Sequence, residues 1–132
     1  VLLKDRESTY VPNLYDAARG VQKYLHMNTN AAESTDANTL TAFNSDGFSV
    51  GSAAWVNGSN DFVSWNWAAG NSGSSNEDGS INTTTTYVDQ TAGISISTYT
   101  GTGDDDATIG HGLGVTPTMG HASFQRRSPS VV

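Results

Sequence analysis

Cysteine is absent from this 132-residue chain, which therefore has neither a disulfide framework nor a thiolate metal site. Charged residues make up only 14% of the sequence, compared with about 25% in an average globular domain. No apolar run reaches the roughly 18 residues that a membrane-spanning helix needs. Stability must therefore come from packing, backbone pairing or oligomerisation.

Basic residues are missing from the whole middle of the chain. No Lys or Arg occurs between Tyr24 and Gln125, whereas acidic residues recur throughout and the net charge is −7. A nucleic-acid binder needs a basic face that neutralises phosphates, and an anionic membrane surface attracts the same kind of face. We therefore expect neither nucleic acid nor a membrane among the partners of this chain.

The abundant residues are small and polar, and they favour an all-β fold. Gly, Ser, Thr, Asn and Ala dominate, and the Thr and aromatic side chains suit pleated surfaces. Asp46-Gly47 lies between two short apolar runs, which predicts a hairpin. Residues 61–68 alternate, which predicts a strand whose Val63, Trp65 and Trp67 point into the core. The predicted fold is an antiparallel β-sandwich, jelly-roll or lectin-like.

The chain length fits a single domain with internal divisions. We expect a β-sandwich module over 1–70, a flexible Gly/Ser/Asn linker or loop over 71–80, and an irregular tail over 120–132. Further strands over 81–119 would complete the module or open the next repeat. Most of the core is expected from Leu40, Phe43, Phe48, Val63, Trp65, Trp67, Ile94 and Ile96.

No catalytic motif is present, so we expect neither an enzyme nor a cofactor. The three histidines, His26, His111 and His121, lie in no HExxH or other metal-binding spacing, and no GxSxG motif occurs. His111 lies between glycines, which predicts a turn residue that hydrogen-bonds nearby backbone.

Three adjacent carboxylates, Asp104, Asp105 and Asp106, are weak candidates for a Ca²⁺ site. They lack the alternating spacing of a calcium-binding loop, and neighbouring residues in extended backbone point apart. A solvated loop is the favoured interpretation, and no metal site is predicted.

Aromatic side chains are the better candidates for binding. The larger set consists of Tyr10, Tyr15, Tyr24, Trp55, Phe62, Trp65, Trp67 and Tyr99, which could form a stacking platform for sugars. We expect Trp55 and Phe62 at the surface, with Asn57 and Asn60 beside them to hydrogen-bond a glycan.

Several phrases, in order along the chain, carry a family resemblance. They are LKDR at Leu3–Arg6, YDAARG at Tyr15–Gly20, KYL at Lys23–Leu25, NTNAAE at Asn28–Glu33, TLTAFNSDGFSVGS at Thr39–Ser52, VNGSNDFVSWNWAAG at Val56–Gly70, SNEDGSI at Ser75–Ile81, AGISISTYTGTG at Ala92–Gly103 and TIGHGLGVTP at Thr108–Pro117. Together they resemble a repeated module of phage structural proteins, common in tail-fibre-like and other virion proteins of marine and cyanobacterial phages. The resemblance implies a place in the virion, other virion proteins as partners, and a homo-oligomer such as a trimer.

The resemblance also implies a repeat. In such proteins HGLG-x-x-P resembles the lead-in to an apolar strand that ends in Lys-x-Arg. Here that motif lies at His111–Pro117, whereas the strand lies at Leu2–Arg6. The chain therefore looks like one period of a repeat, cut in mid-unit. After Met119 the sequence departs from the pattern, and we assign no function to the tail.

These features favour a tail fibre or similar virion appendage module that contributes to attachment to host-surface glycans. A capsid decoration or tail-assembly protein without receptor binding is the alternative. A polysaccharide depolymerase is a third hypothesis, which needs two paired carboxylates from residues such as Glu33, Asp36 and Asp61.

Overall fold

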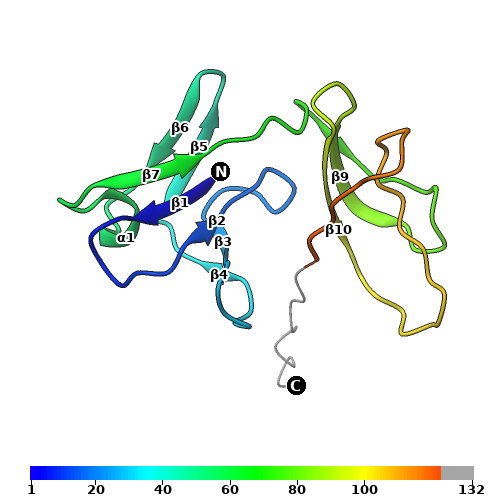
Figure 1. The fold of residues 1–132 in the computed structure, drawn as a ribbon, viewed down its shortest axis with the longest axis horizontal. Coiled ribbons are helices and arrows are strands. Elements are labelled where there is room, and N and C mark those ends of the chain that lie inside the picture. The colour runs from blue at the N-terminus through cyan, green and yellow to red at the C-terminus, as the bar shows by residue number, and fades with distance from the viewer. Residues whose placement is uncertain (123–132) are drawn as a thin grey trace. The chain divides into compact units, whose positions relative to one another are not determined.

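The structure, a computed structural model, describes residues 1–122 (Figure 1). The remainder of the expected tail, 123–132, lies outside the described residues. The chain divides into two compact units. Unit 1 contains residues 1–16 and 20–66 together with His121 and Ala122, and unit 2 contains residues 17–19 and 67–120.

Strands dominate both units. They make up 34% of the described residues, among which no helix reaches seven residues. The prediction of an all-β fold with antiparallel, sandwich-like packing is confirmed. The described residues contain no helix long and apolar enough to cross a bilayer.

One antiparallel sheet of five strands forms the larger layer of unit 1. In spatial order it contains β4 (Ser34–Thr35), β3 (Lys23–His26), β2 (Asn13–Leu14), β1 (Leu2–Asp5) and β7 (Phe62–Trp65). The N-terminal strand β1 therefore lies between two partners, whereas β7 is an edge strand (Figure 1). Gly20 follows the turn at residues 17–19, and its φ of +93° suits a residue without Cβ.

The second layer of unit 1 is a hairpin followed by one helical turn. Strands β5 (Leu40–Asn44) and β6 (Gly47–Val50) pair around the Ser45-Asp46 turn, which confirms the predicted hairpin. An irregularity between Leu40 and Ala42 shifts the register of this pair. The helix α1 (Ala54–Asn57) follows.

The core of unit 1 lies between these layers. Its buried side chains come from the sheet side (Leu3, Tyr15, Tyr24), from the hairpin (Leu40) and from the helical segment (Ala53, Val56). The rings of Tyr15 and Tyr24 lie 5.6 Å apart, within the range of favourable aromatic pairs. Because both layers contribute, unit 1 is a small two-layer domain.

Unit 2 is built on a three-stranded antiparallel sheet in the order β10-β9-β8. Its strands are β8 (Gly73–Ser74), β9 (Thr83–Asp89) and β10 (Ile94–Tyr99). The range 71–80, expected as a linker or loop, includes β8, and Gly73 pairs with Tyr87 there. The ring of Tyr87 covers Gly73 so closely that a Cβ at this position would lie 2.3 Å from the ring.

Buried polar side chains replace much of the apolar core in unit 2. Thr83 and Thr86 are 3% and 5% exposed, and the Thr86 hydroxyl lies 2.9 Å from that of Thr83 and 2.8 Å from that of Ser97. The backbone N–H of Asn76 donates to the Thr83 hydroxyl at 2.7 Å. The buried apolar residues of this unit are few and include Ala69, Ile81 and Leu113.

The predicted core is wrong for three large side chains. Phe43, Trp65 and Trp67 are 37%, 46% and 52% exposed. Trp65 pairs with Leu2, so it points to the same face as Leu2 and away from the buried Leu3. Trp67 lies beyond the end of β7, and Phe43 lies near the tip of the hairpin.

Of the other predicted core residues, one is buried and four are half-buried. Leu40 is fully buried, as predicted. Phe48 is half-buried and packs against the core. The remaining members, Val63, Ile94 and Ile96, are half-buried in their strands.

Candidate functional site in unit 1

The four predicted glycan-binding residues lie along one continuous segment of unit 1. Trp55 and Asn57 belong to α1, Asn60 lies in the bend that follows, and Phe62 begins β7. The loop between β1 and β2 lies beside this segment, because Tyr10 contacts Trp55. This end of unit 1 is therefore assembled from two stretches far apart in the sequence.

Asp5 fixes the two stretches to each other. Its buried carboxylate accepts hydrogen bonds from the backbone N–H groups of Glu7 (2.9 Å) and Ser8 (3.1 Å). The side-chain amide of Asn60 donates to its other oxygen at 2.8 Å. Burial raises the pKa of Asp5, but the hydrogen bonds from Glu7, Asn60 and Ser8 outweigh that effect and lower the pKa to about 2. The Asn60 amide is thus engaged in holding the site together.

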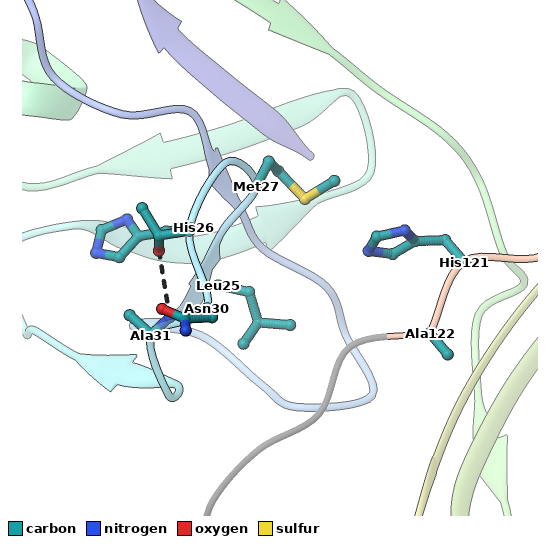
Figure 2. A pocket seen from close by; sticks show the side chains of 8 residues that line it. Leu25, His26, Met27, Asn30, Ala31, His121 and Ala122 are labelled. Atoms are coloured by element: carbon teal, nitrogen blue, oxygen red, sulfur yellow. Dashed lines mark hydrogen bonds between the residues drawn. The ribbon is translucent and has the colours of Figure 1, made fainter.

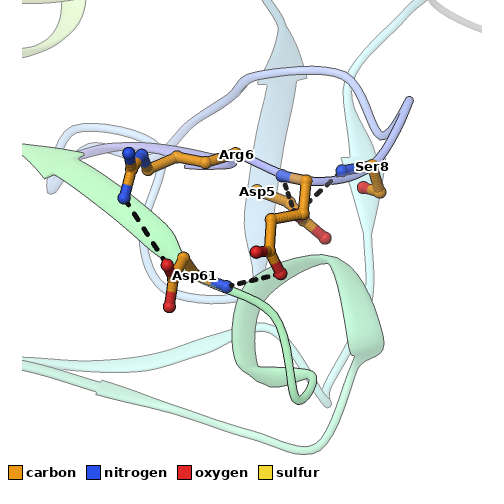
Figure 3. Close-up of polar contacts among 5 residues, drawn as sticks. Asp5, Arg6, Ser8 and Asp61 are labelled. Carbon is orange, nitrogen blue, oxygen red and sulfur yellow. Dashed lines mark hydrogen bonds and ion pairs between the residues drawn. The ribbon is translucent and has the colours of Figure 1, made fainter.

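A second set of contacts lies at the surface beside Asp5 (Figure 3). The Arg6 guanidinium lies 3.7 Å from the Asp61 carboxylate, and the backbone N–H of Asp61 donates to Glu7 at 3.3 Å. Because the side chains of Arg6 and Asp61 are 60% and 73% exposed, solvent screens this ion pair, and it contributes at most about 1 kcal/mol. Asp36, another carboxylate considered for catalysis, instead caps its own turn at Asn38.

Tyr10 and Trp55 form the aromatic part of the site. Their ring centroids lie 6.2 Å apart with the planes tilted by 60°. Tyr10 is 44% exposed, whereas Trp55 is half-buried and packs against the core. Trp55 therefore packs against the core on one side and against the Tyr10 ring on the other. Tyr10 presents the more accessible of the two rings.

Asn57 and Phe62 occupy different environments. Asn57 is exposed, and its amide donates to the Gly51 carbonyl at 3.0 Å. Phe62 is half-buried and pairs with Asp5, so it points to the core side of the sheet. The structure brings Trp55, Asn57 and Asn60 to one end of unit 1, while Phe62 faces inward.

A pocket of about 280 Å³ lies elsewhere in unit 1 (Figure 2). Leu25, Met27, His26 and His121 line it, and the two imidazoles lie on opposite sides. His26 is already engaged, since its Nδ1 lies 2.8 Å from the Asn13 amide oxygen and its ring contacts Tyr24 edge-on. None of the predicted binding residues reaches this pocket.

The remaining candidates lie in unit 2. The Nδ1 of His111 accepts a hydrogen bond from the Leu113 N–H at 3.1 Å, which confirms the predicted turn role. Asp104, Asp105 and Asp106 are exposed, and the described residues contain no group of three His, Cys, Asp or Glu side chains placed to hold a metal ion.

Two of the phrases that carry the family resemblance join each other in unit 2. Ser80 and Thr108 exchange two hydrogen bonds of 2.9 Å between backbone N–H and side-chain hydroxyl, and the Ile81 N–H donates to the Thr108 carbonyl. Asn76 lies so close to Gly110 that a Cβ there would lie 1.7 Å from its Oδ1. Hydrogen bonds between the SNEDGSI and TIGHGLGVTP segments therefore hold distant parts of unit 2 together.

Sequence reasoning did not single out Tyr10 or the role of Asp5. Tyr10 is far from Trp55 in sequence, and no local pattern reveals such a contact. Asp5 sits at the end of a strand, where a charged residue ordinarily faces solvent. The signal that could have identified it is its Asx-type spacing to Glu7 and Ser8 at the end of β1.

Comparison with known proteins gives a family match. A family model described as "Domain of unknown function (DUF7483)" matches residues 1–126, which include every described residue of both units. No curated protein and no solved structure matches the chain.

Proposed function

Because the chain belongs to the DUF7483 family, described as a domain of unknown function, we propose a role for it from its own residues. The role is that of a non-enzymatic structural module of a virion appendage, such as a tail fibre, that contributes to attachment to host-surface glycans. The ordered phrases from LKDR to TIGHGLGVTP support the virion setting, through their resemblance to phage structural proteins. Other virion proteins are the partners that this setting implies.

The observation that carries the attachment role is the exposed Tyr10 ring held against Trp55. Aromatic rings offer large, rigid contact area for the apolar faces of sugars. Asn57 lies exposed on α1 and can hydrogen-bond sugar hydroxyls. The low positive charge of the chain suits neutral sugars better than sulfated or phosphorylated ones.

A second candidate is a capsid decoration or tail-assembly protein without receptor binding. It is favoured by the contacts that the residues of the resembling phrases make. LKDR contacts the Asn60-Asp61 turn through Asp5 and Arg6, and the phrases of unit 2 bind each other through Ser80 and Thr108. Residues used in this way hold the fold together and leave few side chains directed at a ligand.

Glycan binding by the intact protein tests the attachment role. We expect binding on a glycan array and to host cells, and Tyr10→Ala should weaken it roughly three- to tenfold because a stacking surface is lost. Tyr99→Ala is the matched control, since Tyr99 is similarly exposed (46%) but lies in unit 2. A wild-type protein that binds no glycan and no host cell would reject the attachment role.

Locating the chain in a virion reconstruction separates the two candidates. Density for the module at the tip or shaft of an appendage supports the first. Density on the capsid surface or inside the tail supports the second, and purified virions without the chain would contradict both.

A further inference from the structure

The outer edge of β7 has no partner strand. Within the described residues the larger sheet ends at β7, which pairs with β1 alone. An unpaired edge presents a row of backbone donors and acceptors that another strand can extend. Natural proteins usually protect such an edge with Lys, Pro or a bulge.

The backbone groups that point to this open edge can be assigned. The Arg6 N–H donates to the Asp61 carbonyl at 2.8 Å, so these two residues form a hydrogen-bonded pair. Hydrogen-bonded and non-hydrogen-bonded pairs alternate along an antiparallel ladder. The N–H and C=O groups of Val63 and Trp65 therefore point to β1, whereas those of Phe62 and Ser64 point outward.

The edge also lacks charge. No charged residue occurs from Phe62 to Asn76, and no proline occurs in that stretch either. The net charge of −7 opposes the approach of two copies over most of the surface, but not along this uncharged strand. Trp65 is 46% exposed on the outer face of the same strand.

We propose that β7 pairs with β7 of a second copy of this chain, in antiparallel orientation about a two-fold axis at Ser64. The outward groups of Ser64 then bond those of Ser64 in the second copy, and Phe62 pairs with Asn66. Val63 lies directly opposite Trp65 of the second copy, twice by symmetry. These are non-hydrogen-bonded pairs, in which side chains approach most closely and aromatic and β-branched residues pair well.

This self-complementarity identifies the occupant of the edge. Val63 and Trp65 lie two residues apart on one face of β7. In the antiparallel register centred on Ser64, each therefore lies opposite the other residue of the second copy. The inference does not depend on glycan binding, because Tyr10 lies in a different loop and contacts Trp55 rather than β7.

Removal of one edge donor is the first test. Light scattering of the intact chain should give twice the 13.9 kDa of one copy. Ser64→Pro removes an N–H that points away from β1, so the protein should stay folded and its mass should halve. Ser64→Thr keeps the N–H and should remain a dimer. Circular dichroism confirms that each variant is folded.

A single engineered cysteine gives the second test, which does not depend on proline being tolerated. The chain contains no cysteine, so Ser64→Cys introduces a unique thiol. The two-fold axis places the two thiols on strand positions with Cα atoms about 5.5 Å apart, within disulfide range. Mild oxidation should convert most of the protein to a covalent dimer. Ser45→Cys, at the exposed hairpin turn, is the matched control and should not cross-link at the same rate.

Three outcomes would overturn the proposal. The first is a monomer at all concentrations, and the second is an oligomer that Ser64→Pro leaves intact while Ser64→Cys cross-links no faster than Ser45→Cys. The third is an edge that binds an added extended peptide but never a second copy, which would assign it to a foreign strand. A covalent Ser64→Cys dimer that elutes at the size of the wild-type protein would support it.

Discussion

The two units are stabilised by different kinds of buried side chain. Unit 1 buries apolar and aromatic side chains from two layers, with Tyr15 and Leu40 fully enclosed. Unit 2 buries threonine hydroxyls and closes its ends with backbone and side-chain hydrogen bonds. A hydrocarbon core tolerates small shifts of its parts, whereas a polar core requires nearly every donor to meet its acceptor. The units should therefore respond to different substitutions.

The largest expected effect is the loss of a core side chain in unit 1. Leu40→Ala should reduce the free energy of unfolding by about 2–5 kcal/mol, because it leaves a cavity between the hairpin and the sheet. Urea unfolding measures the loss, and Val115→Ala, at a 67% exposed position, should change it by less than about 0.5 kcal/mol. A Leu40→Ala protein as stable as wild type would contradict the assignment of this core.

A methyl group at Gly110 should act on unit 2 alone. Gly110→Ala places a Cβ on the Asn76 side chain and should cost about 1–3 kcal/mol through overpacking. Hydrogen exchange read residue by residue should show faster exchange over unit 2 and unchanged protection in unit 1. Gly101→Ala is the control, since nothing lies within 4 Å of its added Cβ. Equal exchange in both variants would mean that the Asn76 contact does not stabilise the unit.

Removal of one buried hydroxyl should have a smaller effect. Thr86→Val keeps the shape of the side chain but removes the hydrogen bonds that Thr86 makes to the hydroxyls of Thr83 and Ser97, which costs about 1–2 kcal/mol. Thr84→Val, exposed on the same strand, should be neutral within about 0.5 kcal/mol. The comparison of the two melting curves decides whether the hydroxyl network contributes to stability. If Thr86→Val and Thr84→Val had the same melting temperature, the stability of unit 2 would be assigned to its loops.

Acid should weaken unit 1 gradually through Asp5. Its pKa is about 2 in the folded chain and about 3.9 when unfolded, so its contribution is complete above pH 4 and is lost as the pH falls toward 2. Melting temperature measured against pH should therefore fall more steeply in wild type than in Asp5→Asn over that interval. Parallel curves for the two proteins would show that the carboxylate charge does not matter.

Alkaline pH should also destabilise unit 1, through the ionisation of Tyr15. Burial of the phenol raises the pKa of Tyr15 to about 12. The stabilising contribution of the neutral phenol is complete below pH 10 and is lost as the pH rises toward 12. Tyr15→Phe should flatten the fall in melting temperature over that range. An unchanged slope would assign the alkaline transition to other groups.

Local patterns predicted the turns and the strand class better than the faces of the strands. Asp46-Gly47 predicted the hairpin because the turn chemistry is contained within neighbouring residues. The alternation of Val63 and Trp65 was real, but a period of two cannot say which set faces the core. The pairing of Trp65 with Leu2 decided that question, and this pairing joins distant parts of the chain.

The candidate site shows the same limit. Trp55, Asn57 and Asn60 were found because they are adjacent in sequence and belong to residue types that bind sugars. Tyr10 was named only within the larger aromatic set and Asp5 not at all, because their roles arise from contacts with that distant segment. Asn60 was expected to bind a ligand, but in the structure its side-chain amide hydrogen-bonds to Asp5.

The central position of β1 has a consequence for the order in which the chain folds. Leu3 and Asp5 are synthesised well before their partners Ser64 and Phe62, which follow only at the end of unit 1. Pairing across such a separation requires closure of a long loop before any contact compensates for the lost entropy, so it is slow. In unit 2 the strands β9 and β10 are neighbours in sequence and can pair as soon as both exist. On the ribosome, the β1–β7 pairing of unit 1 would therefore need the closure of a long loop, whereas the β9–β10 pairing of unit 2 forms locally.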